Sequence, residues 1–502
     1  MSPSETTDPD SHSARGALAQ VVRDFREFAS AEPLAPALET APERGTPGAD
    51  QADGPLGWPG YDEARARAAL RTGESESVVC GTGIAGGAAP EGRAAPGGGT
   101  GAAGGVQAVL ISFEFGFLGG SLGERTGDRI EAAHLKAREL GLPVVTLVAT
   151  GGSRMQEGMR ALSQLQRVAR QTALTRRAGL PQLAVVRDPS TGGGWATLAA
   201  GADVVLGLPG AQAAFAGSRV RPPDADPAAY TVEGQYAAGH LDQIVPPARL
   251  GGAVAEWLAL LTGGTRSPEP APVPYALTGN GGDGALPGSG PEAVARARSS
   301  GRPRAAAYLY AYFDTRREIS GDRCGGVDPG TLCGFGLREG RAVAYVAQCG
   351  TATLPSGYRA ASRLIRMADR LGLPVLTLID TPGAANGAED ERAGAGPAIA
   401  EVFAAVAEAS VPVTSLLIGE GGSGGALALA APGRLWVTPD SYFSVIAPEP
   451  AAAILKRGPE RVPETAEALR LRPQDAVALG VARGVAEIEE EAGINDPAAG
   501  GE

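Results

Sequence analysis

The sequence predicts an α/β protein made of two tandem domains that share one fold. The first reason is an internal repeat, because four pairs of like residues are all separated by 231 positions: Pro143/Pro374, Thr150/Thr381, Pro181/Pro412 and Gly193/Gly424. A fixed period of this kind indicates duplicated structure. The second reason is that strand-like and helix-like segments alternate in both copies, which is typical of βαβ units with buried strands. Gly-rich turns at matching places in the two copies are the third.

The elements of the first domain can be assigned in order from residue 106 to residue 262. The chain becomes apolar and rich in β-branched and aromatic residues at 106–115, and helical spacing follows at 128–140. Short strands and helices then alternate until a last helix closes the domain: strands 144–148, 183–186 and 204–206, helices 154–178, 195–200 and 250–261. The repeat predicts the same order of elements in a second domain, over residues 303–490.

Three segments outside these domains have compositions that do not predict a packed core. Residues 1–105 are expected to be mostly disordered, since the stretch 81–105 consists almost entirely of Gly, Ala, Pro and Thr. A helix around 17–29 is the exception. Residues 263–302 are rich in Gly, Pro and Ser and are interpreted as a linker, and residues 491–502 as a frayed tail.

The composition narrows the class of protein. The chain has 502 residues and a formal net charge of −12, and its Lys and Arg residues are scattered, which argues against nucleic-acid binding. An apolar run of about 18 residues, the length that predicts a membrane span, is not found. The first 30 residues are acidic and polar rather than basic and then apolar, which argues against a secretory signal. A cytoplasmic protein that binds no membrane is predicted.

Cysteine and histidine provide little material for a metal site. The four cysteines, Cys80, Cys324, Cys333 and Cys349, contain no C-x-x-C pair, so neither a zinc ribbon nor a disulfide framework is indicated. Reduced thiols and no metal in this chain are expected. The sequence has only three histidines, so a Ser-His-Asp triad or a His-based metal site is disfavoured.

The paired Gly-rich turns are the strongest candidates for chemistry. Glycine permits close backbone approach, and the first N–H groups of a helix are unpaired at the positive end of its dipole. Two such turns side by side can direct backbone N–H donors at one oxygen, which makes an oxyanion hole. The predicted catalytic positions are Gly151, Gly152, Gly192 and Gly193 in the first copy, and Gly424, Gly425 and Ala426 in the second. Tight turns with close helix contacts are the structural alternative.

Other site interpretations are weaker. Gly419-x-Gly421-x-x-Gly424, with Asp440 near the expected distance, resembles part of a dinucleotide fingerprint, but the counterpart 188–194 lacks it. Arg154 is the cation best placed to meet an anion at the first turn, although a helix-surface role is equally compatible. The spacing of the acidic candidates pairs no two of them as acid and base: Glu157, Asp188, Asp380, Glu389, Asp390, Glu391, Glu420 and Glu449.

The first half resembles the β subunit of the carboxyltransferase component of acetyl-CoA carboxylase, within the crotonase superfamily. Residues 113–123 match its F-E-F-x-F-M-G-G-S-M-G stretch, and residues 150–158 match S-G-G-A-R-M-Q-E-G. Residues 188–193 match D-P-T-T-G-G, and residues 215–220 match F-A-G-P-R-V.

The second half resembles the α subunit of the same component. Residues 321–323 match G-D-R, residues 379–384 match I-D-T-P-G-A, and residues 418–428 match I-G-E-G-G-S-G-G-A-L-A. Residues 442–449 are similar to Y-S-V-I-S-P-E. The resemblance therefore covers about residues 106–488 and implies a β–α fusion in one chain, with two tandem crotonase-like (ββα-superhelix) domains.

The resemblance also implies an activity, a cofactor and partners. The implied reaction moves a carboxyl group from carboxybiotin to acetyl-CoA or a related short acyl-CoA, giving malonyl-CoA or its analogue. The first hole would hold the thioester carbonyl as an enolate, and the second would hold the ureido oxygen of carboxybiotin. Positions implied for binding the coenzyme A thioester and carboxybiotin are Arg154, Phe215, Ala216, Gly217, Gly383 and Gly422.

Because the chain has no A-M-K-M-like biotinylation site and no recognisable ATP-binding motif, biotin is expected on a separate biotin carboxyl carrier protein, carboxylated by a separate biotin carboxylase. A homodimer is expected, with the first half of one chain facing the second half of the other.

The chain departs from the family pattern at several places. The four-cysteine ribbon of the β subunit is missing, H-Q-K-G is replaced at residues 347–350, G-A-Y-P-G is replaced at 383–387, and Trp195 stands where small residues are usual. Two alternatives therefore stay open. One is a biotin-independent crotonase-type enzyme, such as a decarboxylase, hydratase or isomerase, which needs a side-chain acid or base. The other is a non-catalytic partner of another carboxylase.

Overall fold

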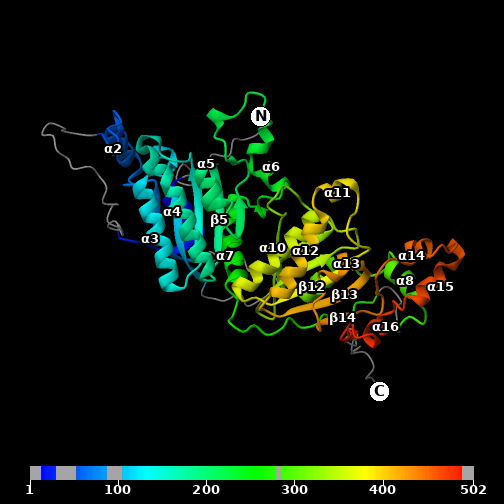
Figure 1. Cartoon of the computed structure of the whole chain (residues 1–502). Helices are drawn as coiled ribbons and strands as arrows, with labels where there is room; N and C mark the ends of the chain where they lie inside the picture. The colour runs from blue at the N-terminus through cyan, green and yellow to red at the C-terminus, as the bar shows by residue number, and fades with distance from the viewer. Residues whose placement is uncertain (1–12, 30–52, 87–104, 279–283, 489–502) are drawn as a thin grey trace, which may run out of the picture.

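The chain forms two α/β domains that lie side by side (Figure 1). The computed structural model describes residues 13–29, 53–86, 105–278 and 284–488. Each domain is built on one mixed sheet of eight strands with helices packed against it. Among the helices of the described ranges, none is long and apolar enough to cross a bilayer.

The first sheet has the strand order β1-β2-β3-β4-β5-β6-β8, with β7 beside the end of β5. Strand β2 pairs antiparallel with β1 and with β3, and the pairs from β3 onward are parallel. Its strands are β1 (Val22–Glu27), β2 (Val78–Ala85), β3 (Val106–Phe113), β4 (Val144–Thr150), β5 (Gln182–Thr191), β6 (Val204–Gly207), β7 (Ala213–Ala214) and β8 (Gln243–Ile244). Its helices are α1 (Ala14–Val21), α2 (Tyr61–Thr72), α3 (Glu124–Leu140), α4 (Gly158–Arg177), α5 (Gly192–Gly194), α6 (Val232–Ala237) and α7 (Leu250–Leu261).

The second sheet has the same order, β9-β10-β11-β12-β13-β14-β16, with β15 beside the end of β13. Its strands are β9 (Thr315–Ile319), β10 (Thr331–Arg338), β11 (Arg341–Gln348), β12 (Val375–Thr381), β13 (Val413–Gly422), β14 (Leu435–Val437), β15 (Tyr442–Ser444) and β16 (Gly484–Val485). Its helices are α8 (Gly290–Arg298), α9 (Ala305–Tyr312), α10 (Pro355–Leu371), α11 (Ala388–Arg392), α12 (Ala395–Glu408), α13 (Ser423–Leu427), α14 (Pro448–Ile454), α15 (Val462–Ala468) and α16 (Pro473–Ala478).

The predicted duplication is confirmed residue by residue. Strands β4 and β12, and strands β5 and β13, begin and end 231 positions apart. The register break between Val148 and Thr150 recurs between Ile379 and Thr381. Gly193 and Gly424 are each the second residue of the short helix that follows the longer of these strands. The two glycine turns therefore occupy equivalent places in two copies of one fold.

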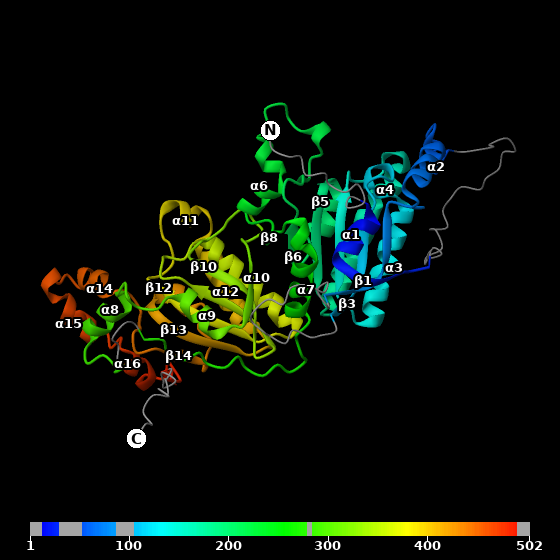
Figure 2. The ribbon, with the colours of Figure 1, turned by 180° about the vertical axis from the view of Figure 1, so that it is seen from behind.

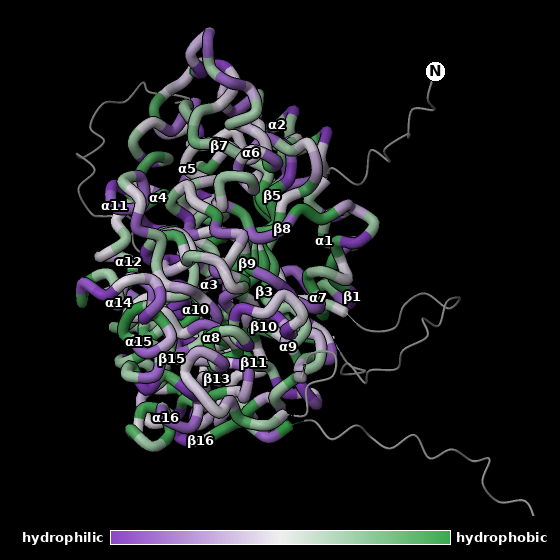
Figure 3. The backbone as a smooth tube through the Cα atoms, turned by 90° about the vertical axis from the view of Figure 1, so that its right-hand side faces the viewer, coloured by the Kyte–Doolittle hydropathy of each residue, from purple (hydrophilic) through white to green (hydrophobic). Residues whose placement is uncertain are grey.

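Helices cover both faces of the first sheet with their buried sides. Helices α3 and α4 pack against one face through residues such as Ile130 and Val168. Helices α1 and α7 pack against the opposite face, as the reverse view shows (Figure 2). The central residues of β3 and the first half of β5 are buried and hydrophobic, and this part of the interior is green in Figure 3. Burial on both faces explains why these strands read as continuous apolar runs rather than as alternating ones.

The two domains share a core and a network of ion pairs. Helix α7 packs on β10 and β11 of the second domain, and the rings of Trp257 and Phe335 lie 6.4 Å apart. Asp242, which is buried, pairs with Arg323 and with Arg363 across the same boundary. The second domain is therefore held against the first by apolar packing and by charges as well as by the connecting chain.

The prediction of a mostly disordered N-terminal region is wrong for the residues that the structure describes. Helix α1 and strands β1 and β2 belong to the first domain, and the helix expected at 17–29 ends at Val21. Gly81 and Gly83 lie inside β2, where added Cβ atoms would be 2.3 Å from the carbonyl oxygen of Arg26 and 2.8 Å from Val22. These glycines permit the close approach of β1. The expected disorder at 1–12, 30–52 and 87–104 lies outside the described residues.

The linker assigned to residues 263–302 is also wrong in part. Helix α8 lies within it, begins at the Ser289 cap with proline in its first turn, and packs on β13, β15 and α15. Helices α8, α14 and α15 gather at the far end of the second domain (Figures 1 and 2). The second domain therefore begins before residue 303. Residues 279–283 and the whole C-terminal tail, 491–502, lie outside the described ranges.

Candidate active site

The first site is built where β4 and β5 end side by side. Thr150 pairs with Ser190 at the last rung of the ladder, so the turns that follow the two strands meet. Gly152 and Gly192 have φ angles of 106° and 65°, which favour glycine. A Cβ atom on Gly192 would lie 3.1 Å from the Cα atom of Gly152. Glycine at these positions lets the two backbones touch.

The backbone donors of the first site are fewer than predicted. The N–H of Gly151 donates to the carbonyl oxygen of Gly119 (2.9 Å), that of Gly152 to the Thr150 hydroxyl (3.0 Å) and that of Gly192 to the carbonyl oxygen of Phe215 (3.0 Å). These three N–H groups hold the turns together in this structure, and the predicted catalytic role of Gly151, Gly152 and Gly192 stays a prediction. Helix α5 has no side-chain cap, and the N–H of Gly193 has no hydrogen-bond partner among the described residues.

The second site repeats this design with tighter packing. The N–H of Gly383 donates to the Thr381 hydroxyl (3.1 Å), as Gly152 does to Thr150. A Cβ atom on Gly422 would lie 2.0 Å from the carbonyl oxygen of Pro382, and one on Gly425 would lie 2.6 Å from the backbone nitrogen of Ala384. The second turn therefore excludes a side chain at these two positions.

One side of the second turn is open. A Cβ atom on Gly424 would meet nothing within 4 Å. Helix α13 has no side-chain cap, and within the described part of the chain neither Gly424 nor Gly425 uses its N–H in a hydrogen bond outside the helix. Ala426 is buried inside α13. Gly424 and Gly425 are thus the donors best placed to meet a ligand oxygen here.

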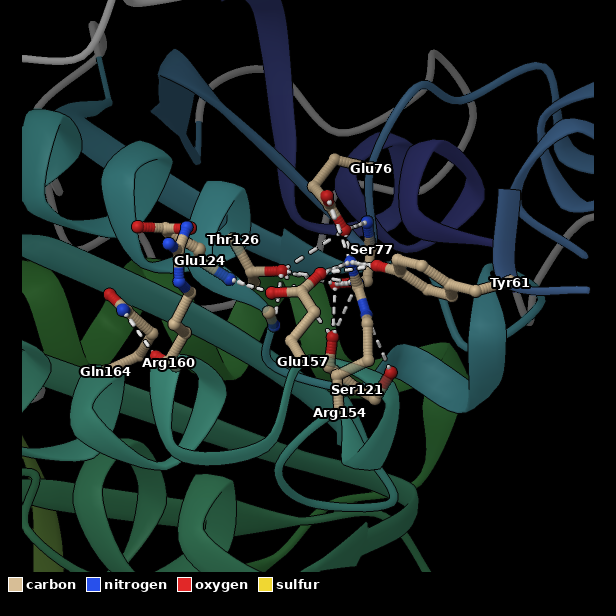
Figure 4. A network of polar contacts seen from close by, with 11 residues as sticks. Tyr61, Glu76, Ser77, Ser121, Glu124, Thr126, Arg154, Glu157, Arg160 and Gln164 are labelled. Carbon is tan, nitrogen blue, oxygen red and sulfur yellow. Dashed lines mark hydrogen bonds and ion pairs between the residues drawn. The ribbon is translucent and has the colours of Figure 1, made fainter. Parts of the chain in front are cut away.

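Arg154 does not face the first turn as an anion site. Its guanidinium is buried and donates to Glu76, Glu157 and the carbonyl oxygen of Ser121 (Figure 4). Tyr61 approaches the same group and donates to Glu157. This geometry favours a structural role for Arg154, since its charge is satisfied inside the domain, and its predicted role in ligand binding stays a prediction.

The electrostatics of this network agree with a structural role. Burial alone would raise the pKa of Glu76, but the Arg154 guanidinium holds that pKa below its usual value of 4.5. Burial and the hydrogen bond with Glu157 raise the pKa of Tyr61 to about 12. Both partners come from the N-terminal region that composition alone assigns to disorder. The apolar run Val78–Cys80 was the available signal that a strand begins beside Glu76.

Three other positions inferred for ligand binding lie next to the first turn. Phe215 follows β7, and its ring is exposed, with 71% of its surface accessible. Its carbonyl oxygen accepts the hydrogen bond from Gly192, which fixes residues 215–217 beside the turn. Ala216 and Gly217 are half-buried. Their contact with a coenzyme A thioester stays a prediction.

The acidic candidates near the second turn hold structure together. Asp380 is buried and pairs with Arg302 (2.9 Å) and Arg304 (3.2 Å). Glu420 pairs with Arg298 (2.9 Å), which also pairs with Glu449 (2.6 Å). Arg298 and Arg302 come from the segment interpreted as a linker, so sequence patterns did not find these pairs.

The resemblance to a dinucleotide fingerprint has a structural explanation. Gly419 and Gly421 lie within strand β13 rather than in a turn before a helix. A Cβ atom on Gly419 would lie 2.3 Å from an Asp380 carboxylate oxygen and 2.4 Å from the Arg302 guanidinium. These glycines make room for the buried ion pair, so the nucleotide interpretation is not supported.

We expect no stoichiometric zinc in the purified protein. Within the described ranges, no group of three or more His, Cys, Asp or Glu side chains could hold a metal ion. Cys80 and Cys333 are buried apart in different domains, and burial raises the pKa of each thiol to about 12, which disfavours the thiolate that binds zinc. Elemental analysis after mild chelation tests this expectation, and one retained zinc per chain would contradict it.

Two family models match the chain. The model described as "Carboxyl transferase domain" matches residues 97–239, and the model described as "Acetyl co-enzyme A carboxylase carboxyltransferase-like" matches residues 290–498. The first match contains the first glycine turn, and the second match contains the second.

Relatives match across both domains. "Acetyl-coenzyme A carboxylase carboxyl transferase subunits beta/alpha" of Saccharopolyspora erythraea is 37% identical over 455 residues, which is 86% of this chain and 75% of the relative. The protein of the same description from Salinispora arenicola is 37% identical over 457 residues, 85% of this chain and 76% of the relative. The solved structure of transcarboxylase 12S covers 95% of this chain and 86% of its own, with a TM-score of 0.70 at 20% identity, and has the same fold. The chain therefore belongs to the family of acetyl-CoA carboxylase carboxyltransferases in which β-like and α-like halves form one polypeptide.

Proposed function

We propose that this protein transfers a carboxyl group from carboxybiotin, carried by a separate carrier protein, to acetyl-CoA or a related short acyl-CoA. The product is malonyl-CoA or its analogue. The observation that carries the proposal is the pair of equivalent glycine turns with open N–H donors, at Gly193 and at Gly424 and Gly425, in a chain of this family. The first turn holds the thioester oxygen, and the second holds the ureido oxygen of biotin.

The residues at the second turn fit a biotin ureido group. That group offers a neutral carbonyl oxygen, and the turn offers backbone N–H donors with open space at Gly424. When bound, carboxybiotin would release CO₂ by cleavage of its N–C bond, and the ureido nitrogen freed in that step would take the α-proton, so that the CO₂ can add to the resulting enolate. Side-chain carboxylates near the turn are already paired with arginines, which agrees with a chain that supplies no general base of its own.

The N–H of Gly193 stabilises the charge that develops on the thioester oxygen of the acyl-CoA. A donor of this kind, fixed in place before the reaction, typically contributes about 10²–10³ in rate. The glycine contacts between Gly152 and Gly192 keep the donor at a fixed position, so no rearrangement is needed when the charge forms.

The proposal is tested by the reverse half-reaction, in which malonyl-CoA carboxylates free biotin or a biotin derivative. We expect formation of acetyl-CoA that depends on biotin. Release of acetyl-CoA at the same rate without biotin would favour a biotin-independent crotonase-type decarboxylase. Failure to turn over malonyl-CoA, with or without biotin, would favour a non-catalytic partner of another carboxylase.

The working unit in this proposal is a dimer in which the first turn of one chain faces the second turn of its partner. Helices α5 and α13 lie in different domains and apart from each other in the chain (Figure 1). Homologous helices of the two domains also expose apolar stripes. On α4 and the turn before it, Met155, Met159 and Leu162 are exposed, and on α12 Ala400 and Phe403 are exposed. In a two-fold dimer, the α4 stripe of each chain would pack against the α12 stripe of its partner, so all four stripes would be buried.

We expect Leu162→Glu to shift the protein from dimer to monomer and to abolish biotin carboxylation, because a charge would be buried in the interface. Leu70→Glu is the matched control, since Leu70 is 88% exposed on α2, away from both stripes. Light scattering at the assay concentration measures the change. If either variant were a fully active monomer, the proposal that the working unit is a dimer would be contradicted.

A further inference from the structure

Three buried polar side chains lie beneath the second glycine turn. Gln348 donates through Nε2 to the hydroxyl of Thr353 (3.0 Å). The Tyr358 hydroxyl donates to the carbonyl oxygen of Gly425 (3.1 Å). All three residues are at most 1% exposed. Burial raises the pKa of Tyr358 to about 12, so its phenol stays protonated and keeps donating.

Between them, these side chains contact both segments that form the turn, the one after β12 and the one after β13. The hydroxyl of Thr353 donates to that of Thr381 (3.4 Å), which accepts the N–H of Gly383 (3.1 Å). On the other side, Tyr358 holds the carbonyl of Gly425. Because a peptide unit is planar, fixing the Gly425 carbonyl also fixes the N–H of Ala426. This contact therefore anchors the first turn of α13, which carries the donors Gly424 and Gly425.

The first domain has the same fold but lacks polar side chains at the positions equivalent to Gln348, Thr353 and Tyr358. The strand register places Phe113 where the second domain has Gln348, since Val109 pairs with Val144 as Ala344 pairs with Val375. The repeat places Leu122 opposite Thr353 and Gly127 opposite Tyr358. The equivalence of Leu122 and Thr353 is also seen in their bridges, Leu122 with Ser153 and Thr353 with Ala384.

The two domains therefore support their turns by different means. In the first, the carbonyl of Gly193 accepts a hydrogen bond from the nearby Thr197 hydroxyl (2.7 Å), and Phe113 and Leu122 are apolar where the second domain has Gln348 and Thr353. Burying polar groups carries a desolvation cost that apolar packing avoids. Since the fold forms without these groups in one copy, folding alone does not account for them in the other.

We propose that Gln348, Thr353 and Tyr358 are positioning residues for the second turn, and that they orient its N–H donors toward the ureido oxygen of biotin. This inference rests on the proposed function, because it assigns the second turn to biotin. The residues touch neither substrate: they act through the backbone of Gly425 and Gly383. Their loss should weaken the biotin half of the reaction and leave acyl-CoA binding unchanged.

The test uses Tyr358→Phe, which removes only one hydroxyl, with Tyr312→Phe as the matched control. Tyr312 is also buried in the same domain, and its hydroxyl donates to the carbonyl oxygen of Pro272 (2.8 Å), away from the turn. In malonyl-CoA-dependent carboxylation of free biotin, we expect Tyr358→Phe to lower kcat/KM for biotin about 3- to 10-fold, the usual range for one neutral hydrogen bond. KM for malonyl-CoA should not change, and Tyr312→Phe should match the wild type.

Thr353 supplies the rescue experiment. Thr353→Val removes the hydroxyl at nearly constant shape and should also impair the biotin half, since it removes the support of the segment that contains Thr381 and Gly383. Thr353→Ser restores the hydroxyl and should recover most of the rate. Equal kinetics for Tyr358→Phe and Tyr312→Phe in an active enzyme would overturn the inference, as would an equal rise in KM for malonyl-CoA and biotin. If the wild-type protein did not catalyse malonyl-CoA-dependent carboxylation of biotin at all, the proposed function itself would be refuted.

Discussion

Replacing Gly425 by valine is expected to lower the rate of biotin carboxylation about 100-fold or more, the scale of one lost oxyanion donor. A Cβ atom there would lie 2.6 Å from the backbone nitrogen of Ala384 and 2.6 Å from the Tyr358 hydroxyl. Backbone cannot yield as a flexible side chain can, so the two segments of the second turn must separate. Steady-state kinetics in both substrates measure the loss, which should fall on biotin.

Gly252→Ala is the control for this substitution. Gly252 lies in α7, and a Cβ atom there would meet nothing within 4 Å. Activity and Tm should match the wild type or rise slightly, because alanine favours a helix. The Tm of Gly425→Val separates a distorted turn from an unfolded domain.

The equivalent change in the first domain should affect the other substrate. At Gly193 an added Cβ atom would meet the Leu165 side chain at 2.4 Å, so valine should displace the first turn and impair use of the acyl-CoA. Glu420→Gln should cost far less than either glycine change, since Glu420 is paired with Arg298 and is not assigned as a base. If both glycine variants stayed active and Glu420→Gln abolished turnover, a side-chain mechanism would be the better account.

Arg154→Met is expected to destabilise the first domain by about 3–5 kcal/mol, because it leaves the buried carboxylate of Glu76 without its cation. Arg160→Met is the matched control: Arg160 also pairs with a glutamate, Glu124, but both side chains are exposed, and such pairs contribute about 0–1 kcal/mol. Urea unfolding monitored by circular dichroism measures the difference. A stable Arg154→Met protein that had lost only acyl-CoA binding would restore the substrate role inferred from the sequence.

The same network should make the domain sensitive to acid. The folded pKa of Glu76 lies below its usual value of 4.5, so the stabilisation that depends on its charge is present above pH 4.5. That stabilisation is lost as the pH falls through the lower, folded pKa. In the double variant Glu76→Gln/Arg154→Met this part of the acid dependence should disappear, which unfolding at several pH values below 5 would detect.

The sequence predicted the elements that its repeat and apolar periodicity determine. Strand β4, helix α7 and the glycine positions 193 and 424 were placed correctly, because each depends on local pattern or on the fixed offset. Strand β2 was missed because its glycines have the composition of a disordered segment. Their role is visible only when β1, distant in sequence, packs against them.

The sequence located the glycine turns of the candidate site, but it did not show which of their N–H groups are available to a ligand. Which N–H groups remain available depends on partners such as Gly119 and Phe215, which come from other loops. Arg154 follows a family motif beside the turn, yet its orientation is decided by Glu76, more than 70 positions earlier in the chain. Side-chain direction and hydrogen-bond competition are tertiary properties that a motif does not encode.

The separation of α5 from α13 within one chain has a genetic consequence if the active unit is the proposed dimer. Each site would combine halves of two polypeptides, so a chain carrying Gly193→Val and a chain carrying Gly425→Val would complement each other. A mixed dimer would contain one doubly defective site and one intact site. Random reassociation of equal amounts would then restore about a quarter of the wild-type activity from two inactive proteins. Sites contained within single chains would show no such recovery.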